Sequence, residues 1–274
     1  MSDIKVVAWQ EDLDAIEREI NARTGNTEKL SFPDEFITEI PNMKDYLDMY
    51  VTGELTEYTS YVKEIPDYMF CEYEAIKKID FPNAIKAGIR SMNGCANLLN
   101  VNAPKLKSGG YYLFENCTSI ETINLPLFEN TGDGCFKGCT SLKQVYLPSF
   151  INSFGSGHHF TECVSLENID LPMIENIGTA TFKNNTALKT VIIPQAKSIG
   201  NYAFENCTAL EAVVIKRSDF ICEISEVSIF KNSSVESGTG FIYVPDNLVK
   251  AYKNATNWSV YANQIRPLSE YIEA

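Results

Sequence analysis

The sequence predicts a repeat solenoid, a stack of short coils that share a parallel β-sheet, with a small α-helical module before the stack and a helical cap after it. The first observation is a pattern that recurs seven times between residues 70 and 216, with a period of 22 residues and one step of 24. Each copy opens on a large apolar residue: Phe70, Met92, Phe114, Phe136, Phe160, Phe182 and Phe204. The second observation is the residue twelve positions later, which is proline except in the last copy: Pro82, Pro104, Pro126, Pro148, Pro172, Pro194 and Lys216. Such a period is typical of stacked units that cannot bury their apolar faces alone.

Residues 1–45 predict a separate small helical module. Leu13, Ile16 and Ile20 recur at helical spacing, and Gly25 is a plausible end of this first helix. A second short helix is expected after Pro33. A module of about 40 residues is at the lower limit of what folds unaided, so it is expected to dock on the solenoid, join a neighbouring chain or remain mobile.

Residues 46–244 form the predicted solenoid, which begins with a partial copy of the repeat. The segment from Leu188 to Ile193, with β-branched residues at its centre, is typical of a strand, and each copy has its equivalent. Strands from successive coils would run parallel about 4.8 Å apart, so that seven coils measure about 35 Å. Short turns or second strands are expected on the return path. It contains a glycine six residues after the proline in five copies, where we expect unusual backbone angles: Gly88, Gly110, Gly132, Gly178 and Gly200.

Most of the eight cysteines occupy one position of the repeat, three residues after the opening residue. These five residues are Cys95, Cys117, Cys139, Cys163 and Cys207. A small semi-polar position at a turn favours buried, reduced thiols, and the paired C-x₂-C spacing of a zinc site is missing from the sequence. The sequence therefore predicts neither disulfides nor a metal or other cofactor.

The single step of 24 residues falls between Pro148 and Phe160 and contains the only two histidines of the chain, His158 and His159. Insertions in solenoids lie in loops, and loops often contain functional residues. A metal site would need further ligands near this pair, so we interpret the histidines as loop residues without a metal.

Residues 245–274 predict a helical cap that covers the last coil. A strand is expected at residues 241–244, followed by a helix that opens at Pro245 and Asp246 and places Leu248, Val249 and Tyr252 on one face. A second apolar set follows and ends at Pro267. A solenoid needs such a cap to cover the exposed apolar face of its last coil.

Composition excludes several classes of partner. The chain has 274 residues and a net charge of −13, which argues against nucleic-acid binding because that needs clustered Lys and Arg. No apolar run approaches the roughly 20 residues that span a bilayer, so no membrane insertion is expected. The motifs of common enzyme classes are missing as well, so we expect no catalytic activity.

The repeat F-x-x-C-x-x-L-x-x-V-x-L-P, followed by I-G-x-x-A-F, closely resembles the BspA-like (Treponema-type) leucine-rich repeat over residues 65–216. This resemblance implies a right-handed solenoid in a surface or adhesive protein, and it supplies no catalytic residue. Residues 240–271 resemble the C-terminal cap of such proteins from gut Firmicutes and their phages, and residues 13–40 resemble a helical module of phage structural proteins. The N-terminus lacks the charged and apolar segments of a secretory signal, so the location stays open between a cell surface and a virus particle.

The leading functional hypothesis is a non-catalytic binding or adhesion scaffold that presents the sheet face to a protein or glycan partner. The expected contact residues are Tyr146, Asp170, Ile192, Gln144, Asn168, His158 and His159. One alternative is that the C-terminal tail covers Ile192 and Val214 and that the apolar end of the face is no binding surface. Another is a structural or host-attachment component of a phage particle, attached through residues 1–45.

Overall fold

The computed structural model of the chain describes residues 55–152 and 157–273. The chain divides into two compact units, residues 1–60 and 61–274. Only residues 55–60 of the first unit are described, and they contain strand β1 (Glu57–Thr59). The predicted helical module 1–45 lies outside the described residues and stays a prediction. Within the described ranges, no helix has the length and apolar character to cross a bilayer.

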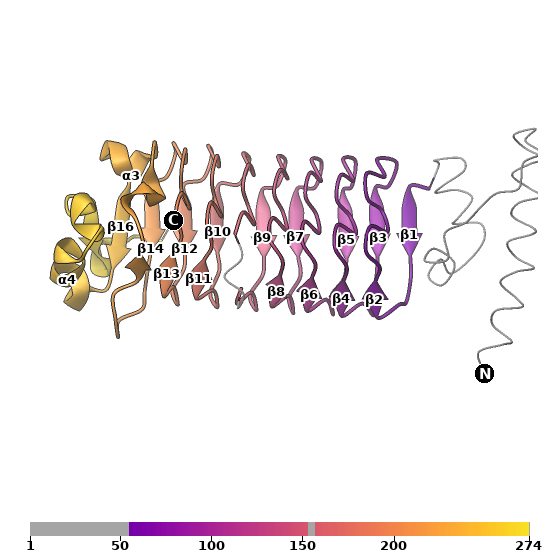
Figure 1. Cartoon of the computed structure of the whole chain (residues 1–274), viewed down its shortest axis with the longest axis horizontal. Helices are drawn as coiled ribbons and strands as arrows, with labels where there is room; N and C mark the ends of the chain where they lie inside the picture. The colour runs from indigo at the N-terminus through magenta and orange to yellow at the C-terminus, as the bar shows by residue number, and fades with distance from the viewer. Residues whose placement is uncertain (1–54, 153–156, 274) are drawn as a thin grey trace, which may run out of the picture. The chain divides into compact units, whose positions relative to one another are not determined.

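The second unit is a solenoid in which each coil adds one strand to a series of parallel strands (Figure 1). Partners in this series lie one repeat apart, as in the pairing of Ile169 with Val191. The series comprises β3 (Lys78–Asp80), β5 (Asn100–Asn102), β7 (Thr122–Asn124), β9 (Gln144–Tyr146), β10 (Asn168–Asp170), β12 (Thr190–Ile192), β14 (Ala212–Val214), β16 (Phe241–Val244) and β17 (Ile265–Pro267). The predicted repeat solenoid with a parallel sheet is therefore confirmed. The backbone pairing is interrupted between β5 and β7 and between β9 and β10, where the structure assigns separate sheets.

A second series of two-residue strands follows the first within each coil, which confirms the predicted second strands. Its members are β2 (Glu64–Ile65), β4 (Lys86–Ala87), β6 (Ser108–Gly109), β8 (Asn130–Thr131), β11 (Asn176–Ile177), β13 (Ser198–Ile199) and β15 (Glu223–Ile224). They form two parallel sheets, one from β2 to β8 and one from β11 to β15. In the sequence, the 24-residue step between Pro148 and Phe160 separates the strands of the first sheet from those of the second.

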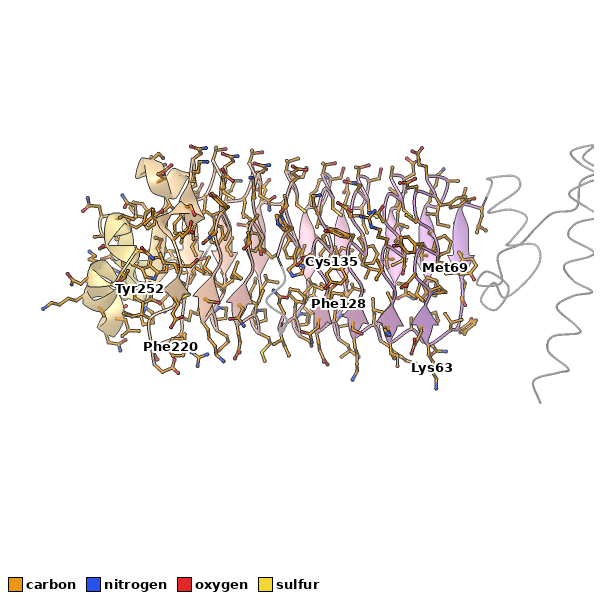
Figure 2. The ribbon with its side chains drawn as sticks, in the orientation of Figure 1. Lys63, Met69, Phe128, Cys135, Phe220 and Tyr252 are labelled. Carbon is orange, nitrogen blue, oxygen red and sulfur yellow. The ribbon has the colours of Figure 1, made fainter. Side chains whose placement is uncertain are left out.

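The interior is a column of stacked phenylalanine rings. Consecutive rings from Phe114 to Phe230 lie 5.2 to 5.6 Å apart and nearly parallel. The column ends where the edge of Tyr261 meets Phe230 at 5.1 Å. Figure 2 shows Phe128 and Cys135, both buried, inside the stack, whereas the exposed Lys63 projects from it. Stacking of identical residues from coil to coil thus builds one continuous core.

The predicted cap, residues 245–274, contains short helices with one exception, and two further helical segments precede it in residues 227–237, where none was predicted. The helical segments after the last regular coil are η3 (Val227–Phe230), α3 (Ser234–Ser237), η4 (Asp246–Leu248), α4 (Val249–Asn254), η5 (Trp258–Tyr261) and η6 (Leu268–Glu270). The exception is β17, because Ile265 pairs with Ile242 of β16 and extends the sheet where helix was expected. The indole of Trp258 donates a hydrogen bond to the carbonyl of Cys222 and joins the cap to the last coil.

The recurring glycine after the second strand serves close packing between coils. None of the five glycines has a positive φ, so the prediction that glycine is needed there for unusual backbone angles is wrong. A Cβ at Gly88 would lie 2.2 Å from an Asp67 oxygen, and one at Gly110 would lie 2.5 Å from the Ile89 nitrogen. Glycine is needed because the backbone of the neighbouring coil occupies the space of any side chain.

Two other positions of each coil have left-handed backbone conformation, with φ between 52° and 73°. The first, two residues before the interior ring, is called here the turn column: Tyr68, Arg90, Tyr112, Gly134, His158, Ala180 and Tyr202. The second, two residues after the ring, contains mainly Asn, Gly and Glu: Glu72, Gly94, Asn116, Gly138, Glu162, Asn184, Asn206 and Asn232. Asn and Gly tolerate this conformation best. Five of the seven turn-column residues are larger, three of them tyrosines, so backbone conformation alone does not explain the choice of residue there.

The cysteine column of Cys95, Cys117, Cys139, Cys163 and Cys207 is buried and free of disulfides. Each thiol donates a hydrogen bond of 3.0 to 3.2 Å to the carbonyl of the opening residue of the preceding coil. Burial raises the pKa of Cys139 and of Cys207 to about 12. The column is therefore a row of thiol hydrogen-bond donors inside the core, and Tyr73 and Asn185 take this position in the other two copies of the repeat.

Candidate binding surface

The outer face of the first strand series is the candidate binding surface. The middle residue of each strand from β3 to β12 points inward, and the flanking residues point outward. The face is polar along most of its length: Asn102 donates to the carboxylate of Asp80 at 2.8 Å, and Thr122 and Asn124 follow on β7. Tyr146 is 58% exposed on this face.

Four of the predicted contact residues share this surface. Gln144 and Tyr146 flank the inward residue of β9, and Asn168 and Asp170 do the same on the adjacent β10. All four are exposed. The structure thus places an aromatic ring among two amides and a carboxylate on neighbouring coils.

The C-terminal end of the face is occupied by the chain itself. Val214 is completely buried and Ile192 is half-buried, so the apolar end of the face is not an open patch. The ring of Tyr271 lies 5.1 Å from that of Tyr243, the residue paired with Val214. These contacts support the alternative that the tail covers this end, and they leave Ile192 at its margin.

Asp170 lies at the boundary between the open and the covered part. Partial burial is the main cause that raises the pKa of Asp170, while Lys216 lowers it and Glu273 of the tail raises it. The tail therefore approaches the face as far as β10. A partner that contacts Asp170 would meet the tail at the same place.

The two histidines do not belong to this face. His158 is an exposed member of the turn column with φ 60°. His159 is completely buried, and the edge of its ring meets Phe150 at 5.4 Å. The expectation that His159 contacts a partner is therefore wrong. Its ring and that of Phe150 pack against each other inside the coil that has the 24-residue step.

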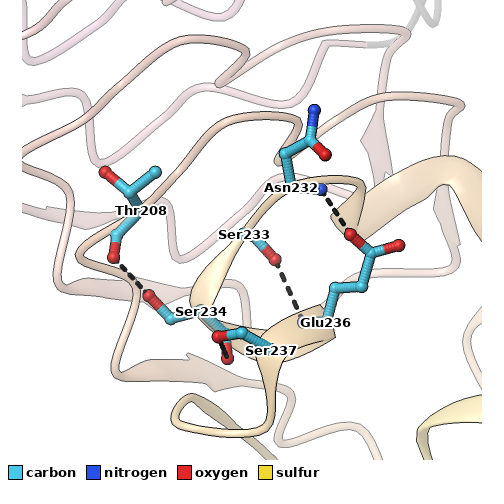
Figure 3. Close-up of a pocket in the computed structure, with 6 residues that line it drawn as sticks. All are labelled: Thr208, Asn232, Ser233, Ser234, Glu236 and Ser237. Carbon is cyan, nitrogen blue, oxygen red and sulfur yellow. Dashed lines mark hydrogen bonds between the residues drawn. The ribbon is translucent and has the colours of Figure 1, made fainter.

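Two hollows lie elsewhere on the solenoid. The first, of about 320 Å³, lies beside α3 and is lined by Thr208, Asn232, Ser233, Ser234, Glu236 and Ser237 (Figure 3). Its polar groups are used internally, because Glu236 accepts from the Asn232 backbone at 2.6 Å and Ser234 donates to the Thr208 carbonyl at 2.5 Å. The second, of about 370 Å³, lies over β11, β13 and β15.

Within residues 55–152 and 157–273, no group of three or more His, Cys, Asp or Glu side chains is placed to hold a metal ion. The buried thiols of Cys117 and Cys163 have a pKa raised well above the ordinary value, chiefly by burial, so neither supplies a thiolate at neutral pH.

Comparison with known proteins gives matches to bacterial repeat proteins. The BspA type leucine rich repeat region matches in six copies over residues 63–189 and 157–259. Among solved structures, a leucine rich repeat protein of T. pallidum is 16% identical, with 69% of this chain and 75% of that chain covered and a TM-score of 0.41. A leucine-rich repeat protein of Eubacterium ventriosum is 26% identical (65% and 43% covered, TM-score 0.44), and the pneumococcal vaccine antigen PcpA is 13% identical (77% and 65% covered, TM-score 0.48). The chain spans less than half the length of the Eubacterium protein. No curated protein matches the sequence.

Proposed function

Because the chain belongs to the BspA-type leucine-rich-repeat family, we propose that it is a non-catalytic scaffold whose sheet face binds a macromolecular partner, a protein or a glycan, around Tyr146. Leucine-rich-repeat proteins generally act as binding scaffolds. The observation that supports this site is the exposed ring of Tyr146 among the polar side chains of β9 and β10.

The rigid support of these side chains favours binding. The inward residue of β10, Ile169, is 3% exposed, and Asn168 and Asp170 are held in register with β12. Outward side chains on such a frame lose little conformational freedom when a partner binds, which lowers the entropic cost of association. Tyrosine is enriched among the residues that dominate binding energy.

The covered end of the sheet limits the proposed surface. Because Val214 is buried and Tyr271 lies over Tyr243, the open part of the face extends from β3 to β10. Tyr146 is the large exposed apolar side chain among the described outward positions of this part. The contact is therefore proposed to centre on Tyr146, with Gln144 and Asn168 beside it and Asp170 at its margin.

The test begins with a protein and glycan array probed with the purified full chain. For the partner so found, the double variant Tyr146→Ala with Asp170→Ala should weaken binding at least about tenfold, since hot-spot truncations typically exceed 1 to 2 kcal/mol. Its melting temperature should stay close to that of the wild type, because both side chains are exposed. Tyr202→Ala, which removes an exposed tyrosine from the turn column, is the matched control and should bind normally.

Normal binding by the double variant would reject this site. If deletion of residues 1–45 then abolished binding, the contact would lie in that module and the solenoid would act as a spacer. Co-purification of the chain with virus particles through the same module would support the alternative of a phage component.

A further inference from the structure

A second group of aromatic side chains lies on the turn column, near the N-terminal end of the solenoid and away from the sheet face. It comprises Tyr68, Arg90 and Tyr112, which occupy the same position in three consecutive coils, together with Tyr111; we call these four residues the tyrosine cluster. Tyr68 is 54% exposed and Tyr111 is 51% exposed. The proposed sheet-face site does not use any of them.

The packing of the next coil fixes the orientation of two of these rings. A Cβ at Gly132 would lie 2.7 Å from Cγ of Tyr111, and a Cβ at Gly134 would lie 2.6 Å from Cδ1 of Tyr112. The rings therefore rest on the glycine backbone of the following coil, in the space that larger residues would fill. One side of each ring is therefore supported by protein, while Tyr111 stays half-exposed.

The backbone of the cluster is rigid. Tyr68 donates its N–H to the carbonyl of Ile89 at 2.8 Å, and Arg90 donates to that of Tyr111 at 2.9 Å. The guanidinium carbon of Arg90 lies 4.9 Å from the centre of the Tyr112 ring. From Tyr68 to Tyr112 the cluster spans two coil spacings, about 10 Å.

Polar groups of both signs border the rings. The Asp67 carboxylate accepts the N–H of Ile89 at 2.7 Å, and the Asp133 carboxylate accepts that of Gly157 at 2.8 Å. Each carboxylate has a second oxygen that is able to accept a hydrogen bond, and Arg90 has several N–H donors. Two carboxylates and one guanidinium give the site donors and acceptors without a strong net charge.

We propose that the tyrosine cluster is a binding platform for a neutral saccharide of about two sugar units. The C–H groups on one face of a pyranose ring are attracted to the negative face of an aromatic ring, and the exposed faces of Tyr68 and Tyr111 offer this contact. Sugar hydroxyls both donate and accept hydrogen bonds, which matches the mixture of Arg90, Asp67 and Asp133. The near balance of charge in the cluster argues for a neutral ligand over a charged one.

Tyr202 provides the internal contrast. It has the same position in the coil and the same φ of 58° as Tyr68 and Tyr112. The ammonium groups of Lys183 and Lys231, however, lie 5.8 Å from the centre of its ring and interact with it. The ring is therefore occupied by the protein's own cations, and we expect no saccharide there.

The test is native gel electrophoresis of the full chain through gels that contain a soluble polysaccharide: galactomannan, xyloglucan, mixed-linkage glucan, arabinogalactan or mucin. The wild type should be retarded in at least one of these gels. Tyr68→Ala and Tyr111→Ala should each weaken the affinity calculated from the retardation about tenfold, because each loses one aromatic contact and the hydrogen bonds that this contact orients. Tyr202→Ala and Tyr146→Ala should migrate like the wild type, and this separates the platform from the sheet-face site.

Alanine is tolerated at the turn column, because Ala180 has φ 52° there, so Tyr68→Ala and Tyr202→Ala should keep the circular dichroism spectrum of the wild type. Tyr111→Ala and Tyr146→Ala should keep it as well, because both replace exposed side chains. Wild-type migration that matches a non-binding reference protein in every gel would overturn the proposal. Equal retardation of wild type and Tyr111→Ala would do the same. Retardation by mucin that survives periodate oxidation of its sugars would show protein binding and would also count against it.

Discussion

Asn185 should be a weak point of the core, and its replacement by cysteine should stabilise the protein. It occupies the position of the cysteine column in its coil, it is completely buried, and its amide oxygen and nitrogen have no hydrogen-bond partner. In the five coils with cysteine at this position, the thiol donates to the opening residue of the coil before it, as Cys207 does to Phe182 at 3.0 Å. Asn185→Cys would place a thiol at the same distance along the chain from the carbonyl of Phe160.

The magnitude follows from the amide that is removed. A buried polar group without a partner costs about 1 to 3 kcal/mol, and cysteine is close to asparagine in size, so little cavity or overpacking is introduced. The free energy of unfolding should therefore rise by about 1 to 3 kcal/mol. For a domain of this length the melting temperature should rise by about 2 to 4 °C per kcal/mol.

Urea unfolding followed by circular dichroism measures this change. The reverse substitution, Cys139→Asn in the middle of the stack, is the matched control and should destabilise by a similar amount. Asn185→Ala separates the two causes, because it removes the amide without adding a thiol and leaves a small cavity. If Asn185→Cys is no more stable than the wild type while Cys139→Asn is less stable, then the amide of Asn185 is satisfied in solution and the reasoning is wrong.

Three further predictions concern the stack. First, a thiol reagent should label about one of the eight cysteines in the native protein, because Cys71 is the half-exposed one, and all eight in denaturant; labelling of several buried thiols would show an open core. The pKa of Cys139 is raised to about 12 in the folded state. The contribution of this thiol to stability should therefore be constant below about pH 8, and it should be lost as the pH rises from the pKa of the unfolded chain, near 9, towards 12. Urea unfolding midpoints at increasing pH would measure this loss. Second, Glu205→Gln should lower the free energy of unfolding by about 1 to 3 kcal/mol, since the nearly buried carboxylate lies 2.7 and 3.2 Å from two lysine ammonium groups. The pKa of Glu205 is lowered, chiefly by the hydrogen bond from Lys183, so this contribution should be present above the unfolded pKa and lost as the pH falls through the folded pKa. Glu167→Gln, which changes an exposed ion pair, should have a smaller effect. Third, deletion of residues 182–203, one full period, should leave a folded and shorter solenoid with its β-sheet signal intact, because each coil contacts only its neighbours; loss of that signal would contradict a stack of local interactions.

The repeat could be predicted from the sequence wherever one residue type recurs at a constant interval. The recurring pattern is sufficient for the strand series and for the burial of the cysteine column. It fails after Lys216, where Phe230 adds one more ring to the interior column after a step of 26 residues from Phe204. The four extra residues of this step break the 22-residue period, and only the ring-to-ring distance shows that Phe230 continues the column.

The parts of the candidate site that the sequence missed depend on contacts between coils. A glycine 21 residues after a tyrosine gives no signal that the Tyr111 ring rests on Gly132, because that contact depends on the height of a coil and the direction of a side chain. The burial of His159 was missed for a similar reason, since the partner that fills its surroundings, Phe150, belongs to an earlier part of the same coil. Polar residues next to an insertion indicate a loop, but they do not say which side chains the loop buries.

The same coil-to-coil stacking that makes the core continuous also divides the surface between the two ends of the solenoid. At the C-terminal end the stack must be closed, so β16, β17 and the cap helices bury Val214 and bring Tyr271 over the sheet face. At the N-terminal end of the second unit, glycines in the fourth coil make room for Tyr111, which is exposed, and for Tyr112, which is half-buried. Both proposed contacts, one on the sheet around Tyr146 and one on the tyrosine cluster, therefore lie on the coils that precede or adjoin the 24-residue step. A chain shortened within residues 182–203 should keep both binding activities, because the deletion removes neither surface and retains the residues that close the stack.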